Sequence, residues 1–215
     1  MKRVMQLAVA IAIAAIAVGG TQAVLATHQP ANKVVAAGDK LVVTGPNTAV
    51  PILSATLKTS KPEDLILQVA LECSITTALV TSNDDPSSSA SGDIRVWVEI
   101  DGVRVPINSI SNPPQPPPAA GDPSDEVTFC NRTYSRTVMD QENPLDGQDR
   151  EEDFIDTKTS NAFNWLRLNM QSGSHTIVVK ATLTESASGD ATAEALIGNR
   201  SLIVEPTKLA NDATI

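Results

Sequence analysis

Apolar and polar residues alternate along most of the chain after residue 50. The clearest case is "DIRVWVEIDGVRVPI", residues 93–107, in which every second residue from Ile94 to Ile100 is apolar until an Asp101-Gly102 pair. A period of two is typical of a half-buried strand, and Asp-Gly favours a two-residue type I′ turn. The predicted hairpin pairs Ile100 with Val103, Val98 with Val105, Val96 with Ile107 and Glu99 with Arg104.

Further strands follow the same pattern. In "LILQVALECSIT", residues 65–76, the alternation puts Cys73 on the apolar face. In "EVTFCNRTY", residues 126–134, the register stays open: Cys130 points inward with Thr128, or a bulge brings Phe129 inward as well. We expect other strands at 52–58, 163–170, 176–182 and 195–204. Since no stretch after the first 26 residues shows sustained helical periodicity, the pattern predicts an all-β antiparallel sandwich.

Three polar segments interrupt the strands and predict long surface loops. They are "SNDDPSSSASGD" at 82–93, "SNPPQPPPAAGDP" at 111–123 and "DQENPLDGQDREED" at 140–153. Proline lacks the backbone donor that a sheet interior needs, so the second segment should cross the surface in an extended form.

One short stretch resembles a known superfamily. In "LNMQSGSHTIVVKA", residues 168–181, the positions of Gly173, His175 and the alternating residues Ile177, Val179 and Ala181 are similar to the corner and rising strand of immunoglobulin-like and fibronectin-like sandwiches. The order Cys73, Trp97, Cys130 is similar to the core of immunoglobulin domains. The resemblance implies an Ig-like fold and no activity. The ending "LIVEPTKLANDATI" is similar to that of uncharacterised secreted prokaryotic proteins.

The first 26 residues have the layout of a secretory signal peptide. Lys2 and Arg3 precede an apolar run at 7–18, and small residues follow up to Ala26. We expect removal of 1–26, an extended segment at 27–50, a β-sandwich domain at 51–206 and a tail at 207–215. The apolar run is shorter than the roughly 20 residues that span a membrane, so no span is expected after cleavage. The protein should be secreted or lie at the cell surface.

The net charge and the cysteines limit the possible partners and the covalent structure of the protein. Removal of Lys2 and Arg3 leaves 14 of the 16 basic residues against all 25 acidic ones, a formal charge of −11. Such a chain repels nucleic acid. The two cysteines of an exported chain predict one disulfide, Cys73 to Cys130.

Few residues suggest chemistry. His28 and His175 have no metal-ligand spacing, and we expect His175 to hydrogen-bond the backbone at the corner. Trp97 lies on the face of the hairpin that is opposite to the valines. There it either stacks on a sugar ring or is covered by a neighbouring loop. Asn131 and Asn199 begin two N-x-[ST] sequons and are possible glycosylation sites.

The acidic segment at 140–153 raises the question of calcium. No frame of it supplies the glycine and the final glutamate of an EF-hand, so we expect a solvated loop without a metal. The alternative is a different kind of calcium site, with Asp140, Glu142, Asp146 and Asp149 as ligands.

These observations predict a secreted, non-enzymatic structural or adhesive protein without a cofactor. Its expected partners are copies of itself, other surface proteins or glycans, and the stretch at 27–50 is a candidate to pair with a neighbouring subunit's sheet edge. The alternative function is a carbohydrate- or calcium-dependent extracellular binding module.

Overall fold

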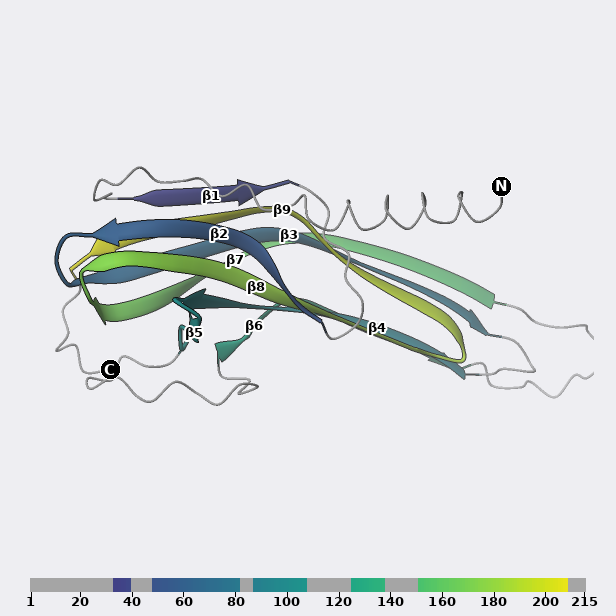
Figure 1. Ribbon diagram of the computed structural model, residues 1–215. Coiled ribbons are helices and arrows are strands. Elements are labelled where there is room, and N and C mark those ends of the chain that lie inside the picture. The colour runs from purple at the N-terminus through teal and green to yellow at the C-terminus, as the bar shows by residue number, and fades with distance from the viewer. Residues whose placement is uncertain (1–32, 40–47, 82–86, 108–124, 138–150, 209–215) are drawn as a thin grey trace, which may run out of the picture.

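The computed structural model describes residues 33–39, 48–81, 87–107, 125–137 and 151–208. Figure 1 shows long, twisted strands in two layers. Within the described residues the strands are β1 (Val34–Gly38), β2 (Ala49–Thr59), β3 (Glu63–Thr81), β4 (Ser87–Ile100), β5 (Val103–Arg104), β6 (Val127–Thr137), β7 (Glu151–Met170), β8 (Gly173–Ser188) and β9 (Asp190–Thr207). No helix in these segments is long and apolar enough to cross a membrane.

The strands form two antiparallel sheets, which confirms the all-β sandwich. The first sheet has the order β1-β9-β3-β7, and the second has the order β2-β8-β4 with β5 and β6 both beside β4. Without the short β5, the chain pairs as if folded in half: β1 with β9, β2 with β8, β3 with β7 and β4 with β6. This nested pairing is the arrangement of a jelly roll.

The immunoglobulin-like resemblance does not extend to this strand order. In an immunoglobulin sandwich the first strand lies beside the second, whereas here β1 lies beside the last strand, β9. Strands of either topology carry the same alternation, so the local pattern could not separate the two.

The predicted hairpin is confirmed at its turn and is wrong further out. Asp101 and Gly102 have φ values of 53° and 81°, as a type I′ turn requires. Glu99 pairs with Arg104, and the Val105 amide donates to the Val98 carbonyl at 2.8 Å. Val96, however, pairs with Val127 of β6 instead of Ile107. Pro106, which has no amide proton, follows directly after the paired residues, and β6 takes the place beside β4.

The hydrophobic core lies between the two sheets. The predicted inward face of β3 is confirmed: Leu65, Leu67, Val69, Leu71, Cys73 and Ile75 are all buried. In β6 the register shifts between the partners of Ile94 and Arg95, and both Phe129 and Cys130 are buried. The bulged alternative for this strand is therefore the one found.

Three segments are more ordered than the sequence indicated. Residues 87–93 belong to β4 and not to a loop, because β6 pairs with residues 87–93 on one side and β8 pairs with residues 89–93 on the other. Residues 151–153 of the acidic segment belong to β7 and pair with β3. Residues 34–38, expected to precede the sandwich and considered for pairing with another subunit, form β1 and pair with the chain's own β9. The segments 111–123 and 140–150 lie outside the described residues.

The strands continue beyond the disulfide, at the right of Figure 1. We call this part of the sandwich the distal half. It comprises residues 76–81, 87–92, 132–137, 151–156, 184–188 and 190–195, which are paired across both sheets. Apart from Leu79, its buried positions are small or polar: Thr77, Thr81, Ser88, Ala90, Gly92 and Ala195. A Cβ on Gly92 would lie 2.7 Å from Cγ2 of Ile75, so the two sheets approach closely here.

Candidate functional site

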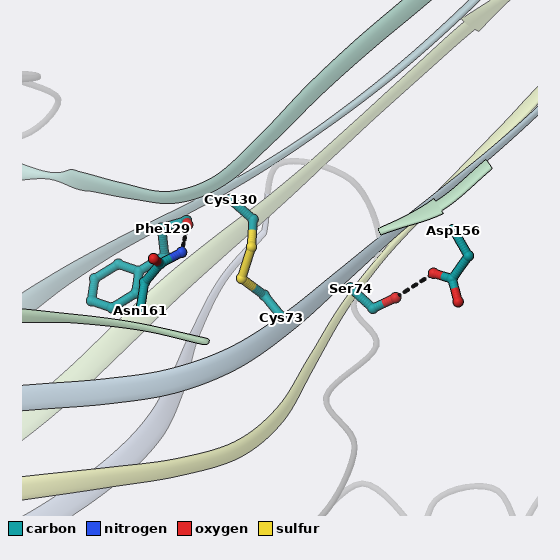
Figure 2. Close-up of a disulfide and its surroundings, with 6 residues drawn as sticks. All are labelled: Cys73, Ser74, Phe129, Cys130, Asp156 and Asn161. Atoms are coloured by element: carbon teal, nitrogen blue, oxygen red, sulfur yellow. Dashed lines mark hydrogen bonds between the residues drawn. A yellow bond between two sulfur atoms is a disulfide. The ribbon is translucent and has the colours of Figure 1, made fainter. Parts of the chain in front are cut away.

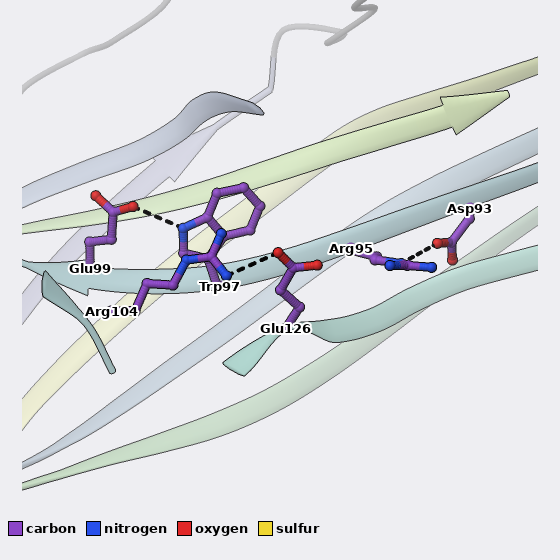
Figure 3. Close-up of polar contacts among 6 residues, drawn as sticks. All are labelled: Asp93, Arg95, Trp97, Glu99, Arg104 and Glu126. Atoms are coloured by element: carbon purple, nitrogen blue, oxygen red, sulfur yellow. Dashed lines mark hydrogen bonds and ion pairs between the residues drawn. The ribbon is translucent and has the colours of Figure 1, made fainter. Parts of the chain in front are cut away.

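Trp97 lies at the centre of a charged cluster on the outer face of β4 (Figure 3). The Arg104 guanidinium carbon lies 4.3 Å from the centroid of the Trp97 ring, and Trp97 Nε1 donates to Glu99 Oε1 at 2.9 Å. Arg104 also donates to Glu126 Oε1 at 3.0 Å. With only 2% of its surface exposed, Trp97 offers no open ring face to a sugar. The ligand-stacking interpretation is therefore wrong, because a cation–π contact occupies the ring.

Glu99 ties this cluster to β8. Its Oε2 lies 2.9 Å from the Lys180 ammonium, and Lys180 and Trp97 are cross-strand partners. Burial raises the pKa of the Glu99 carboxyl, but the hydrogen bonds from Trp97 and Lys180, with the charges of Lys180 and Arg104, outweigh it and hold the pKa below its usual value. The cluster is thus a neutralised network that covers an aromatic residue.

His175 lies at the β corner, as expected, and hydrogen-bonds the backbone. Its Nε2 lies 2.8 Å from the Gln171 carbonyl oxygen, and its Nδ1 lies 2.8 Å from Asp101 Oδ2. The other carboxylate oxygen of Asp101 accepts from the Thr176 amide at 2.8 Å. His175 therefore joins the β4–β5 turn to the start of β8, which is a structural role.

The Cys73–Cys130 disulfide joins the two sheets, since Cys73 lies in β3 and Cys130 in β6 (Figure 2). The Cα atoms are 6.4 Å apart, within the range of disulfides, and the predicted pairing is confirmed. Beside it, Asn161 of β7 donates to the Phe129 carbonyl at 2.6 Å. Figure 2 shows this second link between the two sheets, from β7 to β6, next to the disulfide.

A small crevice opens next to the disulfide. It has a volume of about 170 Å³, and both apolar and polar residues line it: Ile75, Phe129, Cys130, Asn131, Arg132, Thr157 and Thr159. It is well below the roughly 300 Å³ at which ligand pockets begin. We assign it no ligand.

The two sequons differ in their surroundings. Asn131 is exposed on the outer face of β6, opposite Asp93 of β4. Asn199 is also exposed, but its amide nitrogen donates to Glu72 Oε2 at 2.8 Å, and Glu72 also pairs with Lys158. A glycan would be linked to that same amide nitrogen, so of the two residues Asn131 is the one whose geometry suits modification.

The calcium ligands considered for the acidic segment, Asp140, Glu142, Asp146 and Asp149, lie outside the described residues. Asp153, at the end of the segment, faces β6, where it pairs with Arg136 and accepts from the Tyr134 hydroxyl at 3.2 Å. Among the described residues, no group of three or more histidine, cysteine or acidic side chains could hold a metal ion.

A face of hydroxyl side chains covers the distal half of the second sheet. We call it the hydroxyl face, and it comprises Ser87, Ser89, Ser91, Thr133, Ser135, Thr137, Ser186 and Ser188. The register places these residues in rows across three strands: Thr133, Ser91 and Ser186 form one row, and Ser135, Ser89 and Ser188 form the next. Within the second row, the hydroxyl oxygens of Ser89 and Ser188 are 2.7 Å apart.

Sequence reasoning missed this face. Its central strand was interpreted as a loop because Ser, Gly and Asp are common in turns. One signal was present: residues 87–91 read "SSSAS", and on a strand alternate serines share one face. Residues 133–137 and 184–188 also carry hydroxyl residues at every second position. Three such stretches together would have indicated a sheet face.

Comparison with known proteins does not identify a family. No family model matches the chain, and no curated protein does either. Among solved structures, similarity is found to the CBM36-1 domain of a multidomain xylanase from the hindgut metagenome of Trinervitermes trinervoides, with 14% identity, 83% of this chain and 100% of that chain covered, and a TM-score of 0.24. The Eiger TNF from S. frugiperda has 7% identity, coverages of 86% and 99%, and a TM-score of 0.23.

A third similar structure is the D431N mutant VP2 protein of infectious bursal disease virus. It has 9% identity and a TM-score of 0.28, and the match covers 85% of this chain but only 39% of that chain. These TM-scores are too low to support a conclusion about fold or function.

Proposed function

We propose that this chain is an extracellular structural or adhesive protein, not an enzyme, and that the hydroxyl face makes its contacts with other surfaces. The observation that carries the proposal is the composition of that face. Its eight residues are all serine or threonine in a chain with 25 acidic and 16 basic residues. Surfaces of soluble domains typically carry roughly a quarter to a third charged residues, so an uncharged region of this extent calls for a reason.

The chemistry of the face suits contact with a polar surface. Each hydroxyl both donates and accepts hydrogen bonds, and a short side chain loses little conformational entropy when it is held. On a sheet, neighbouring hydroxyls repeat every ~4.8 Å across the strands and every ~6.7 Å along them. A regular array of this kind can form many weak hydrogen bonds at once with a glycan or with another protein surface.

The test is retention of the full-length mature protein on cell-envelope material from its own source, measured by surface plasmon resonance. The variant S91K/S135K/S188K places three lysines on the hydroxyl face and leaves both sequons intact. The matched control A37K/Q68K/T192K adds the same charge at exposed positions of the other sheet. We expect at least a tenfold loss of retention for the first variant only. Equal retention by both variants would sink the proposal.

The alternative, a carbohydrate- or calcium-dependent binding module, would use the same face without the stacking tryptophan. A glycan array probed with and without calcium separates the two. Binding to a defined glycan as a dispersed protein favours the module, whereas retention on envelope material without a glycan hit favours the structural or adhesive role.

A further inference from the structure

Strand β7 forms an edge of the first sheet over its whole length. It has 20 residues, and its only strand partner among the described residues is β3. Its pairing with β3 runs without a register shift from residue 151 to residue 167. A long, regular edge strand presents a row of backbone donors and acceptors that can pair with another strand.

Other strand edges of the described sandwich carry features that hinder such pairing, and the outer strand of the second sheet, β6, has a register shift opposite Ile94 and Arg95. β1 has only five residues. β2 contains Pro51, followed by a register shift. In the part of β9 that β1 does not cover, the Ala195 amide donates to Glu185 Oε1 at 2.7 Å. Short length, proline, bulges and side-chain caps are the usual protections against edge pairing, and β7 contains neither proline nor glycine.

Two exposed hydrophobic side chains single out a pairing register on β7. Phe154 is 72% exposed and Leu166 is 39% exposed, and both point to the outer face of the first sheet. Ser160 lies midway between them, six residues from each. If two β7 strands pair antiparallel with Ser160 opposite Ser160, Phe154 of each copy lies opposite Leu166 of the other. Residues 153–167, which pair with β3 without a register shift, then all find partners.

We propose that β7 is the interface of a symmetric dimer, in which two copies pair antiparallel about Ser160 and join their first sheets into one. Such an interface is isologous and closes as a dimer. The backbone edges supply hydrogen bonds, and each Phe154–Leu166 pair buries apolar surface that is exposed in the single chain.

The charges on the outer face of β7 fit this register. Lys158 falls opposite Ala162, and Asp156 falls opposite Asn164, so no two like charges meet directly. The Lys158 ammonium pairs with Glu72, and Asp156 accepts from Ser74 at 2.8 Å, so both side chains are held over β3 and not over the free edge. The two-fold axis of an antiparallel edge pair is perpendicular to the sheet, so the two hydroxyl faces lie on the same side of the dimer.

The test is site-specific cross-linking. Two Cα atoms opposite each other in an antiparallel pair are about 4.5–5.5 Å apart, which permits a disulfide. We expect Ser160→Cys to give a covalent dimer under mild oxidation, with residue 160 linked to residue 160 and Cys73–Cys130 intact by peptide mapping. Ser186→Cys, at another exposed position on β8, is the control and should stay monomeric.

Sedimentation equilibrium supplies the second measurement. F154K/L166K should raise the dimer dissociation constant at least tenfold, whereas Val35→Lys, at an exposed position of β1 that is 48% accessible, should leave it unchanged. The proposed interface is overturned if the wild-type protein is monomeric and the Ser160→Cys variant forms no cross-linked dimer. So does an equal effect of the Val35→Lys control. Because dimerisation is measured without any envelope material, its failure is distinct from a failure of the adhesive role.

Discussion

Asp101 shows how much one residue does at the β corner. It adopts a positive φ in the turn, its carboxylate faces His175, and it accepts from the Thr176 amide. Burial raises the pKa of the Asp101 carboxyl, but the hydrogen bonds from His175 and Thr176 and the histidine charge outweigh it and lower the pKa. A carboxyl with a lowered pKa stabilises the fold above its unfolded-state pKa, and this contribution is lost as the pH falls through the folded-state value.

We therefore predict that Asp101→Asn flattens the acid side of the stability profile. Asparagine tolerates the positive φ and keeps an acceptor for the Thr176 amide, but it does not titrate. Urea unfolding between pH 7 and pH 2.5 should show wild-type stability falling more steeply than that of the variant below about pH 4, the ordinary carboxyl pKa. Parallel profiles for the two proteins would contradict this account of Asp101.

Trp97 shows the limit of sequence reasoning for a single side chain. The alternation placed it correctly on the outer face of β4, opposite the valines. That face is not open, because Arg104 comes from the paired strand and covers the ring. The Glu99–Arg104 pairing was predictable from the Asp-Gly turn. The contact between Arg104 and Trp97 depends on rotamers, which a sequence pattern does not specify.

At the scale of elements, the disulfide is the covalent link between the sheets. It joins β3 to β6, which do not pair with each other, and closes a loop with a sequence separation of 57. Such a loop restricts the unfolded chain and, on the chain-entropy model, stabilises the fold by about 4 kcal/mol. We predict that C73A/C130A loses roughly 2–5 kcal/mol in urea unfolding. A loss below about 1 kcal/mol would mean that the pairing of the strands alone fixes the two sheets.

Most strands were predictable, but their ends and order were not. The alternation located β3 and the β4–β5 turn because their apolar residues are large and regular. It missed the first half of β4, where Ser88, Ala90 and Gly92 are the buried residues, because small side chains give little hydrophobic contrast. The strand order escaped prediction because it depends on contacts between distant strands, such as β1 with β9.

At the scale of the whole molecule, the sandwich has two halves of different interior. Near β1 and β2 the space between the sheets holds large aliphatic side chains, including Leu57, Leu65 and Leu67. In the distal half it holds mainly small and polar ones. Buried apolar area is the main source of stability, so the distal half contributes less stability per residue. The distal half contributes little stability but carries the exposed hydroxyl face, which is consistent with the role proposed for that face.

Thr77 makes this difference measurable. Its side chain is fully buried in the distal half, and its hydroxyl has no hydrogen-bond partner among the described residues. A buried hydroxyl without a partner costs about 1–3 kcal/mol, which valine avoids at nearly the same volume. We predict that Thr77→Val raises the free energy of unfolding by about 1 kcal/mol. Thr59→Val is the matched control: its hydroxyl donates to the Gln171 carbonyl at 3.1 Å, so that variant should lose stability.

Hydrogen exchange locates the effect. Local opening depends on how much apolar surface holds a segment, so amides of residues 76–81 should exchange faster than those of residues 65–71 on the same strand, β3. Thr77→Val should slow exchange in 76–81 and leave 65–71 nearly unchanged as long as 76–81 opens by itself. Uniform protection along β3 in the wild-type protein would instead show that the sandwich opens as one unit. The distal half would then be as firmly held as the core, and its small, polar interior would have to be stabilised by the strand pairing and the disulfide.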